Sequence, residues 1–223
     1  MESLVPTGIA GFDDLLHGGL PGNRLYLLQG DPGVGKTTLS LQFLLEGVRR
    51  NEKGLYITFS ESRAEIEGVA RSHGWSLDQL EIFEFEAMQH ALAVEQAGTV
   101  FHPSETELSA VTKKLWDVIE RTKPRRMVFD SLSDLRLLAG DPLHYRRQLM
   151  EIKRRAAALS CAAILVDDHT ATHDDLQLQS LAHGVISLHR QPVGYGTAKH
   201  RIEILKLRGA QFRSGGHDFT IER

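Results

Sequence analysis

Eight consecutive residues have the spacing G-x-x-x-x-G-K-[ST] of a phosphate-binding loop, in the order Gly30-Asp31-Pro32-Gly33-Val34-Gly35-Lys36-Thr37. Glycine lets successive backbone N–H groups turn toward phosphate oxygens, because no Cβ blocks the conformations that such a loop needs. A helix beginning at Lys36 would add its partly positive N-terminus to the same anion. We therefore expect Lys36 to contact the β- and γ-phosphates of a nucleotide and the Thr37 hydroxyl to bind Mg²⁺. The full set of expected contacts is Asp31, Pro32, Gly33, Val34, Gly35, Lys36, Thr37 and Thr38.

Acidic side chains follow three other apolar runs, at the points where parallel strands would end. Glu61, Asp130 and Asp168 each lie within two residues of such a run. Ligands of open α/β sheets bind outside the carboxyl ends of the strands, so these carboxylates are expected near the phosphate loop. We predict that Asp130 orients the metal, as a Walker-B aspartate does, and that Glu61 is the general base for water. The alternative, which we favour for Asp168, is that acids at such junctions cap helices.

The elements that would position these groups alternate along the chain. Apolar runs predict strands at 25–28, 54–59, 82–85, 127–129 and 162–166. Helical spacing and a capping box at Ser104–Glu107 predict helices at 36–50, 62–73, 104–119 and 143–159. This alternation predicts an α/β fold with a mostly parallel central sheet flanked by helices. Further strands at 185–189, 199–208 and 219–221 predict an antiparallel C-terminal extension, and the lack of repeats or linkers predicts a single domain over 1–223.

Several motifs occur together in a fixed order between about Pro6 and Ile221. They are Pro6–Asp13 with Gly18–Gly22, Gly30–Thr38, Tyr56–Ser62, Asp130-Ser131 and Leu205–Gly209. With them the chain resembles the KaiC-like ATPases of the RecA superfamily. The resemblance implies a RecA-like P-loop NTPase core, Mg²⁺-dependent ATP hydrolysis, and rings, commonly hexamers, with ATP between neighbouring subunits. It suggests a signalling or timing role with protein signalling partners. Longer members join two such domains, so a single-domain protein and the N-terminal half of a tandem protein both stay open.

The resemblance also implies that Lys206 and Arg208 act in trans, at the γ-phosphate that an adjacent subunit holds. Residues two apart on a strand share a face, so both cations can point at one target. A fixed cation there would stabilise the charge of the transition state, as an arginine finger does. The alternative is a solvated edge strand whose basic side chains discourage aggregation.

Two positions depart from the family pattern. Where clock-type members carry two adjacent glutamates, this chain has Ser60 and then Glu61, which leaves one carboxylate as the base. Where autophosphorylating members carry a Ser-Thr pair, it has Gln179-Ser180, which argues against autokinase activity and leaves Ser180 as the candidate acceptor. Two further functions compete with hydrolysis in a ring: a nucleotide-dependent assembly module with vestigial hydrolysis, and a recombinase-like ATPase that binds DNA.

The composition restricts the partners and the cellular compartment that we expect for this protein. With 26 basic and 29 acidic residues the net charge is −3, whereas nucleic-acid-binding domains are usually basic. The segments 132–142 and 170–184, which follow the strands after which recombinases bind DNA, lack the basic and aromatic residues used for single strands. We therefore expect no DNA partner. The single cysteine, the absence of an apolar run near ~18 residues and the absence of a signal-peptide pattern predict a cytoplasmic protein without membrane contact.

Overall fold

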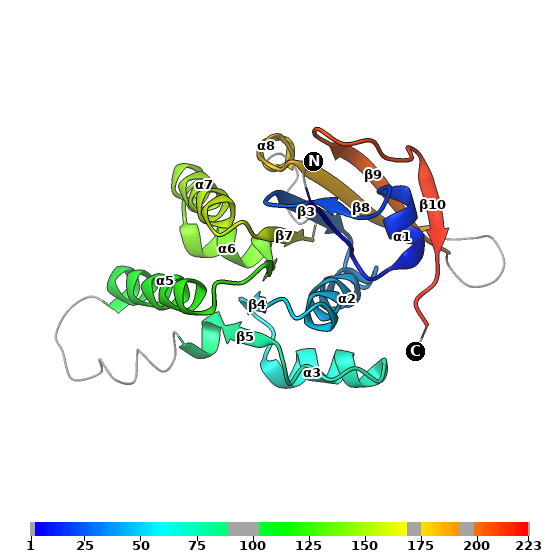
Figure 1. The fold of residues 1–223 in the computed structure, drawn as a ribbon. Coiled ribbons are helices and arrows are strands. Elements are labelled where there is room, and N and C mark those ends of the chain that lie inside the picture. Colours follow the sequence, from blue (N-terminus) through cyan, green and yellow to red (C-terminus); the bar gives the residue numbers. More distant parts are fainter. Residues whose placement is uncertain (1–2, 89–102, 169–174, 192–198, 223) are drawn as a thin grey trace.

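The centre of the protein is an eight-stranded sheet with helices on both faces (Figure 1). A computed structural model describes residues 3–88, 103–168, 175–191 and 199–222. From one edge to the other the strands are β10 (Gly216–Phe219), β9 (Lys199–Leu207), β8 (Gly184–Gln191), β3 (Leu25–Gly30), β7 (Ala162–Asp167), β6 (Arg126–Asp130), β4 (Gly54–Thr58) and β5 (Glu81–Glu84). The strands from β8 to β5 are parallel, and β9 and β10 extend the sheet in antiparallel fashion. The predicted fold class is therefore confirmed.

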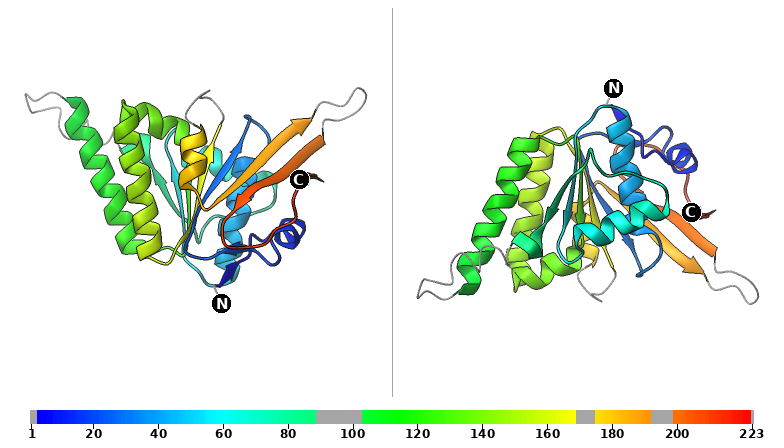
Figure 2. Two further views of the ribbon diagram at one scale, coloured as in Figure 1. Left: turned by 90° about the horizontal axis from the view of Figure 1, so that it is seen from above. Right: turned by 90° about the horizontal axis from the view of Figure 1, so that it is seen from below.

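The helices form two layers, one on each face of the sheet (Figure 2). One layer holds α1 (Ala10–Leu15), α2 (Lys36–Arg49) and α3 (Arg63–Ser72). The other holds α5 (Pro103–Thr122), α6 (Leu132–Ala139), α7 (Pro142–Ala158) and α8 (Asp175–Leu181). Successive strand residues point to opposite faces, so Tyr26 and Leu28 of β3 pack in the α2 layer, while Leu25 and Leu27 pack in the α7 layer. We call these two sides the α2 face and the α7 face.

A small N-terminal unit precedes the sheet and covers part of the α2 face. Strands β1 (Leu4–Val5) and β2 (Leu20–Pro21) pair antiparallel around α1. Within this unit, Asp13 Oδ1 accepts hydrogen bonds from Thr7 N at 2.7 Å and Thr7 Oγ1 at 2.8 Å, and Asp13 Oδ2 accepts from Gly8 N at 3.2 Å. The lead-in motif Pro6–Asp13, one of the motifs that carry the family resemblance, therefore has a structural role, because it fixes the turn that leads into α1.

Several elements differ from those predicted. Helix α5 begins at Pro103 rather than after an N-cap at Ser104, in keeping with the preference of proline for the first helical turn. Helix α6 lies in the segment 132–142, for which no helix was predicted; Leu132 and Leu135 give this short helix a buried face. Strand β10 ends at Phe219, so the predicted strand at 219–221 was wrong. Among the described helices, none is both long and apolar enough to cross a membrane.

Candidate nucleotide site

The glycine-rich loop lies at the carboxyl end of the central strand β3. Residues Asp31–Gly35 connect β3 to α2, and Lys36, Thr37 and Thr38 form the first turn of that helix. Gly33 and Gly35 have φ angles of +79° and +101°, which side chains other than glycine rarely allow. A Cβ on Gly33 would meet nothing within 4 Å, so the loop is open there. Since α2 begins without a side-chain cap, its first N–H groups can bind an anion.

The Lys36 side chain folds back over the loop and is only 7% exposed. Its Nζ donates to Gly30 O at 2.7 Å and to Asp31 O at 2.9 Å, and lies 2.8 Å from Asp168 Oδ1. Strand β7, which ends at Asp167, pairs directly with β3, and this neighbourhood brings Asp168 to the loop. The Lys36 ammonium is therefore surrounded by oxygen atoms, which are the kind of partner that phosphate oxygens could replace.

A carboxylate and a hydroxyl meet at the first turn of α2. Thr37 Oγ1 donates to Asp130 Oδ2 at 3.4 Å, and Tyr56 OH donates to the same oxygen at 2.5 Å. Burial raises the pKa of Asp130 and the nearby charge of Asp168 adds to the rise, whereas the Tyr56 hydrogen bond opposes it. Tyr56 was not predicted from the sequence. Its hydrogen bond to Asp130 depends on the pairing of β4 with β6, and this strand order cannot be deduced from the sequence pattern. Oxygen donors of this kind suit Mg²⁺.

Glu61 lies in a turn that strand β4 holds in place. Thr58 Oγ1 donates to Glu61 O at 2.8 Å and accepts from Glu61 N at 3.0 Å. Phe59 N donates to Asp130 O at 2.9 Å, so the turn is tied to the end of β6. Partial desolvation of the Glu61 carboxyl raises its pKa, and the charges of nearby acids, first Asp130, raise it further. The structure thus brings Glu61 into the same electrostatic environment as the other predicted site carboxylates.

Asp134 is an additional acid that was not predicted from the sequence. Its Oδ2 accepts hydrogen bonds from Ser60 Oγ at 3.1 Å and from Ser131 Oγ at 2.7 Å. Asp134 also contributes to the raised pKa of Glu61. A carboxylate from α6 therefore lies within hydrogen-bond distance of Ser60, the position where clock-type members of the resembled family have a glutamate. The spacing Ser131-x-x-Asp134, typical of helix starts, was the available signal.

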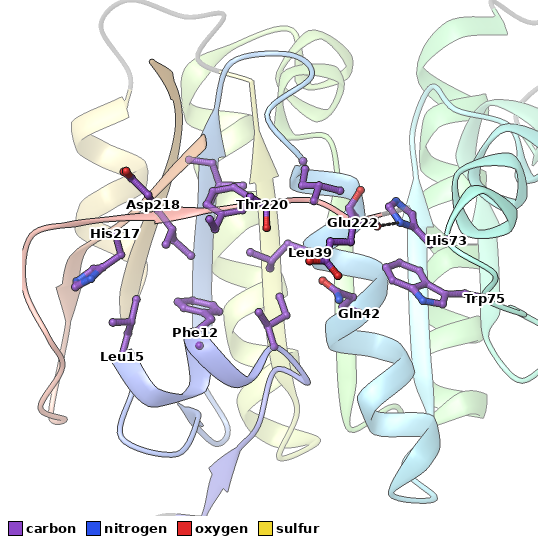
Figure 3. A pocket seen from close by; sticks show the side chains of 18 residues that line it. Phe12, Leu15, Leu39, Gln42, His73, Trp75, His217, Asp218, Thr220 and Glu222 are labelled. Atoms are coloured by element: carbon purple, nitrogen blue, oxygen red, sulfur yellow. Dashed lines mark hydrogen bonds between the residues drawn. The ribbon is translucent and has the colours of Figure 1, made fainter. Parts of the chain in front are cut away.

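An apolar pocket of about 450 Å³ adjoins the loop on the α2 face (Figure 3). Gly35 of the loop is one of its lining residues. Phe12 of α1 and Trp75, which follows α3, contribute aromatic walls. The segment after β10 closes one side, where His73 Nδ1 donates to Glu222 O at 2.8 Å. The His73 and Trp75 rings stack with centroids 4.5 Å apart. A pocket of this size and polarity can hold a planar organic group beside the phosphate loop.

Lys206 and Arg208 lie away from this loop, on the α7 face. Lys206 pairs with Val185 across β9 and β8, whereas the loop residue Gly30 pairs with Leu188, three residues or about 10 Å further along β8. A bulge between Val185 and Ile186 turns Lys206 toward α8. Its Nζ donates to the carbonyls of Gln179 and Ala182, and Arg208 Nη2 donates to Ser180 O at 3.1 Å. The structure therefore does not bring these two cations to the phosphate loop of their own chain.

The chain matches the family model described as ATPase: KaiC over residues 5–223. A UPF0273 protein from Thermotoga maritima is 29% identical, over 99% of this chain and 93% of that protein. The circadian clock oscillator protein KaiC from Thermostichus vulcanus is 30% identical, over 97% of this chain but 42% of that protein, so the chain spans about two fifths of its length. A KaiC-like protein from Pyrococcus horikoshii shares the fold, with a TM-score of 0.80 at 22% identity over 100% of this chain and 96% of the other. The chain therefore belongs to the KaiC ATPase family.

Proposed function

We propose that the chain is a Mg²⁺-dependent ATPase that works in a hexameric ring, as one domain over residues 1–223, in a signalling or timing role in the cytoplasm. The observation that carries this proposal is the convergence of Lys36, Thr37, Asp130 and Glu61 at the carboxyl end of the parallel sheet. These groups come from helix α2, from the end of strand β6 and from the turn after strand β4. Membership of the KaiC ATPase family supports the assignment of ATP as the substrate.

The first part of the mechanism is binding of the phosphates. Lys36 exchanges its contacts with two loop carbonyls and Asp168 for β- and γ-phosphate oxygens, while the free N–H groups of α2 bind the same anion. Thr37 and Asp130 would hold Mg²⁺, which neutralises phosphate charge. Within the described residues, no group of three His, Cys, Asp or Glu side chains is placed to hold a metal ion. The ion would therefore depend on phosphate oxygens and water for most of its ligands.

The second part is activation of water by Glu61. The raised pKa of its carboxyl group makes it a stronger base than an ordinary surface glutamate, and the turn held by Thr58 fixes its backbone. Glu61 would orient the attacking water and accept its proton. Asp134, which Ser60 and Ser131 hold by hydrogen bonds, adds to the negative charges, first that of Asp130, that raise the pKa of Glu61.

The third part is placement of the nucleoside and completion of the site by a neighbour. The pocket next to Gly35 would take the base against Trp75, since the pocket continues from the phosphate loop. Lys206 and Arg208 face away from their own loop, which supports a role for them at the phosphates of an adjacent copy. The ring arrangement would bring the α7 face of one copy to the α2 face of the next.

Replacing Glu61 by Gln tests this function. The variant should keep its affinity for ATP but lose turnover by about 10²-fold or more, because the amide cannot accept the proton. Turnover is measured as released inorganic phosphate, and ATP affinity by calorimetry. Glu67→Gln in α3 removes the same charge away from the site and serves as the control.

Different results would support the competing functions. ATP-dependent assembly without turnover in the wild type would indicate an assembly module with vestigial hydrolysis. Labelled γ-phosphate found on the protein instead of in solution would indicate an autokinase, with Ser180 of α8 as the first position to examine. Unchanged turnover in Glu61→Gln would contradict the role of Glu61 as the base.

A further inference from the structure

The last turn of α8 is held by three cationic side chains from other elements. Lys153 Nζ of α7 donates to Leu181 O at 2.9 Å, Arg208 Nη2 donates to Ser180 O at 3.1 Å, and Lys206 Nζ donates to Ala182 O at 2.7 Å and to Gln179 O. Four consecutive carbonyls at this helix end thus each accept a hydrogen bond from a cation. We call Lys153, Lys206 and Arg208 the α8 cation cluster.

The α8 cation cluster carries more positive charge than its surroundings neutralise. The end of a helix supplies roughly half a negative charge, against three formal positive charges. In the described ranges, no carboxylate forms a salt bridge with any of the three side chains. Burial, followed by repulsion from Arg208 and other cations, lowers the pKa of both Lys153 and Lys206. Such a concentration of like charge favours the binding of an anion.

The cluster also keeps hydrogen-bond donors available. An ammonium group has three N–H donors and a guanidinium group has five. In the bonds described above, Lys153 uses one donor, Lys206 two and Arg208 one. Counted over the residues that the structure describes, the α8 carbonyls therefore orient the three side chains and leave further N–H groups for a ligand with several oxygens. Cations that are held in place and retain donors are suited to a ligand with phosphate oxygens.

A purely structural role explains this arrangement less well for Lys153. A neutral donor would satisfy Leu181 O without adding a third positive charge beside Lys206 and Arg208. Lys153 comes from α7, a different element from the strand that carries the other two cations, yet it ends on the neighbouring carbonyl of the same turn. Its presence thus raises the charge of one shared site.

We propose that Lys153 is a third trans-acting cation, which together with Lys206 and Arg208 binds the polyphosphate of a nucleotide held by a second copy of the chain. This inference rests on the proposed function and adds a residue to it. The cluster lies on the α7 face, whereas its own phosphate loop leads into α2 on the opposite face, so the ligand must come from a neighbouring copy.

The first test compares Lys153→Gln with Lys153→Arg. The proposal predicts that Lys153→Gln lowers turnover at saturating ATP about tenfold, because charge at the phosphates is lost, while Lys153→Arg stays within about twofold. Arg154→Gln removes the same charge from the adjacent residue, which pairs with Glu151 and lies outside the cluster, so its turnover should stay at the wild-type level. Equal turnover in Lys153→Gln and wild type would contradict the proposal.

The second test asks in which copy Lys153 acts. Copies with Glu61→Gln keep the cluster but lack the base, and copies with Lys153→Gln keep the base but lack one cation. Mixing them should raise turnover above that of either variant alone, because some interfaces then join an intact base to an intact cluster. If Lys153 instead acts in its own subunit, the mixture should show only the low turnover that its Lys153→Gln copies have by themselves. That result would contradict action in trans.

The third test uses His183 as a reporter that does not depend on activity. Leu25 N donates to His183 Nδ1 at 3.2 Å, and burial, then Lys153, Arg24 and Arg208, lower the pKa of His183 to about 4. Titration by NMR without nucleotide should give a higher His183 pKa in Lys153→Gln than in wild type.

In the wild-type protein, ATP with Mg²⁺ should also raise the pKa of His183, since phosphate would offset the cluster charge. An unchanged pKa of His183 in the wild type on addition of ATP would contradict the proposal. This measurement uses only the wild-type protein, so it remains a valid test even if Lys153→Gln folds poorly. Absence of turnover in the wild type would overturn the proposed function. Normal wild-type turnover that is insensitive to Lys153→Gln would overturn only the role of Lys153.

Discussion

Lys36 and Thr37 were identifiable from the sequence because the spacing of the loop follows directly from how backbone and side chains surround a phosphate. The role of Asp168 was not identified from the sequence, since we favoured the interpretation that it caps a helix. The structure places its carboxylate 2.8 Å from Lys36 Nζ. Tyr56 and Asp134 were also missed, because each contact joins segments whose neighbourhood depends on strand order. The motifs thus indicated which residues could bind a nucleotide, whereas the partners of these residues could be identified only from the three-dimensional fold.

Asp168→Asn should strengthen ATP binding about three- to tenfold, because the carboxylate no longer competes with phosphate for Lys36. The same change removes one of the charges that raise the pKa of Glu61. The base then stays ionised to lower pH, so the acid limb of the turnover profile should shift toward lower pH.

Calorimetry and a pH series of phosphate release check both effects of Asp168→Asn. Asp117→Asn on α5 makes the same charge change far from the loop and should alter neither. Weaker ATP binding in Asp168→Asn would mean that Asp168 helps to hold the nucleotide or its metal, contrary to this expectation.

Secondary-structure elements were largely predictable, because buried strands are apolar and the longer helices show helical spacing. The predicted strands at 25–28, 54–59, 82–85, 127–129 and 162–166 all lie in the sheet, with ends that shift by one or two residues. Short elements were harder: α6 has too few residues for a clear period, and β10 depends on pairing with β9 through contacts such as Arg201 with Asp218 at 2.9 Å. Tertiary contacts, rather than local pattern, determine these elements.

The side chain of Arg126, the first residue of β6, connects several elements of the fold. Its guanidinium is fully buried, with Nε donating to Glu52 Oε2 at 2.6 Å and Nη1 donating to Pro6 O at 2.6 Å and Phe43 O at 2.8 Å. A Cβ on Gly47 of α2 would lie 2.6 Å from the Arg126 side chain, so this glycine allows α2 to pack on β6. One side chain thus connects the N-terminal unit, α2 and β6.

Arg126→Ala should lower the free energy of unfolding by about 3–5 kcal/mol, since it leaves Glu52 without its partner and removes a buried side chain. Denaturation in urea measures the change. Arg125→Ala at the neighbouring, exposed position is the control, with an expected change within about 0.5 kcal/mol. Equal stability of both variants would contradict a joining role for Arg126.

At the scale of the whole molecule, the two predicted halves of the site lie on opposite faces of the sheet. Lys36 begins a helix of the α2 face, while Lys206 and Arg208 contact α8 on the α7 face. The sequence could not show this, because the bulge that turns Lys206 toward α8 is a feature of strand register. Two different faces imply a head-to-tail contact, which closes into a ring when the rotation permits.

The proposed ring predicts an ATP-dependent change in molar mass. With ATP and Mg²⁺, light scattering should give a mass near six subunits for the wild type and a lower mass for Arg208→Ala, which lacks a contact to the neighbour's phosphate. Arg154→Gln, a surface change on α7, should assemble as the wild type does. A wild-type protein that stays monomeric in every condition would contradict the ring.

Whether one site is shared between two copies is decided by ATP turnover in an equimolar mixture of Glu61→Gln and Arg208→Ala. Each variant alone should be inactive, since every site lacks either the base or the cation. Interfaces at which an Arg208→Ala copy should supply the cation are weaker, so the mixture does not assemble at random. Random assembly would place an intact base opposite an intact Arg208 at about a quarter of interfaces, so turnover should rise above that of either component, to at most about a quarter of the wild-type value. A mixture as inactive as its two components, measured beside an active wild type, would contradict a site completed in trans.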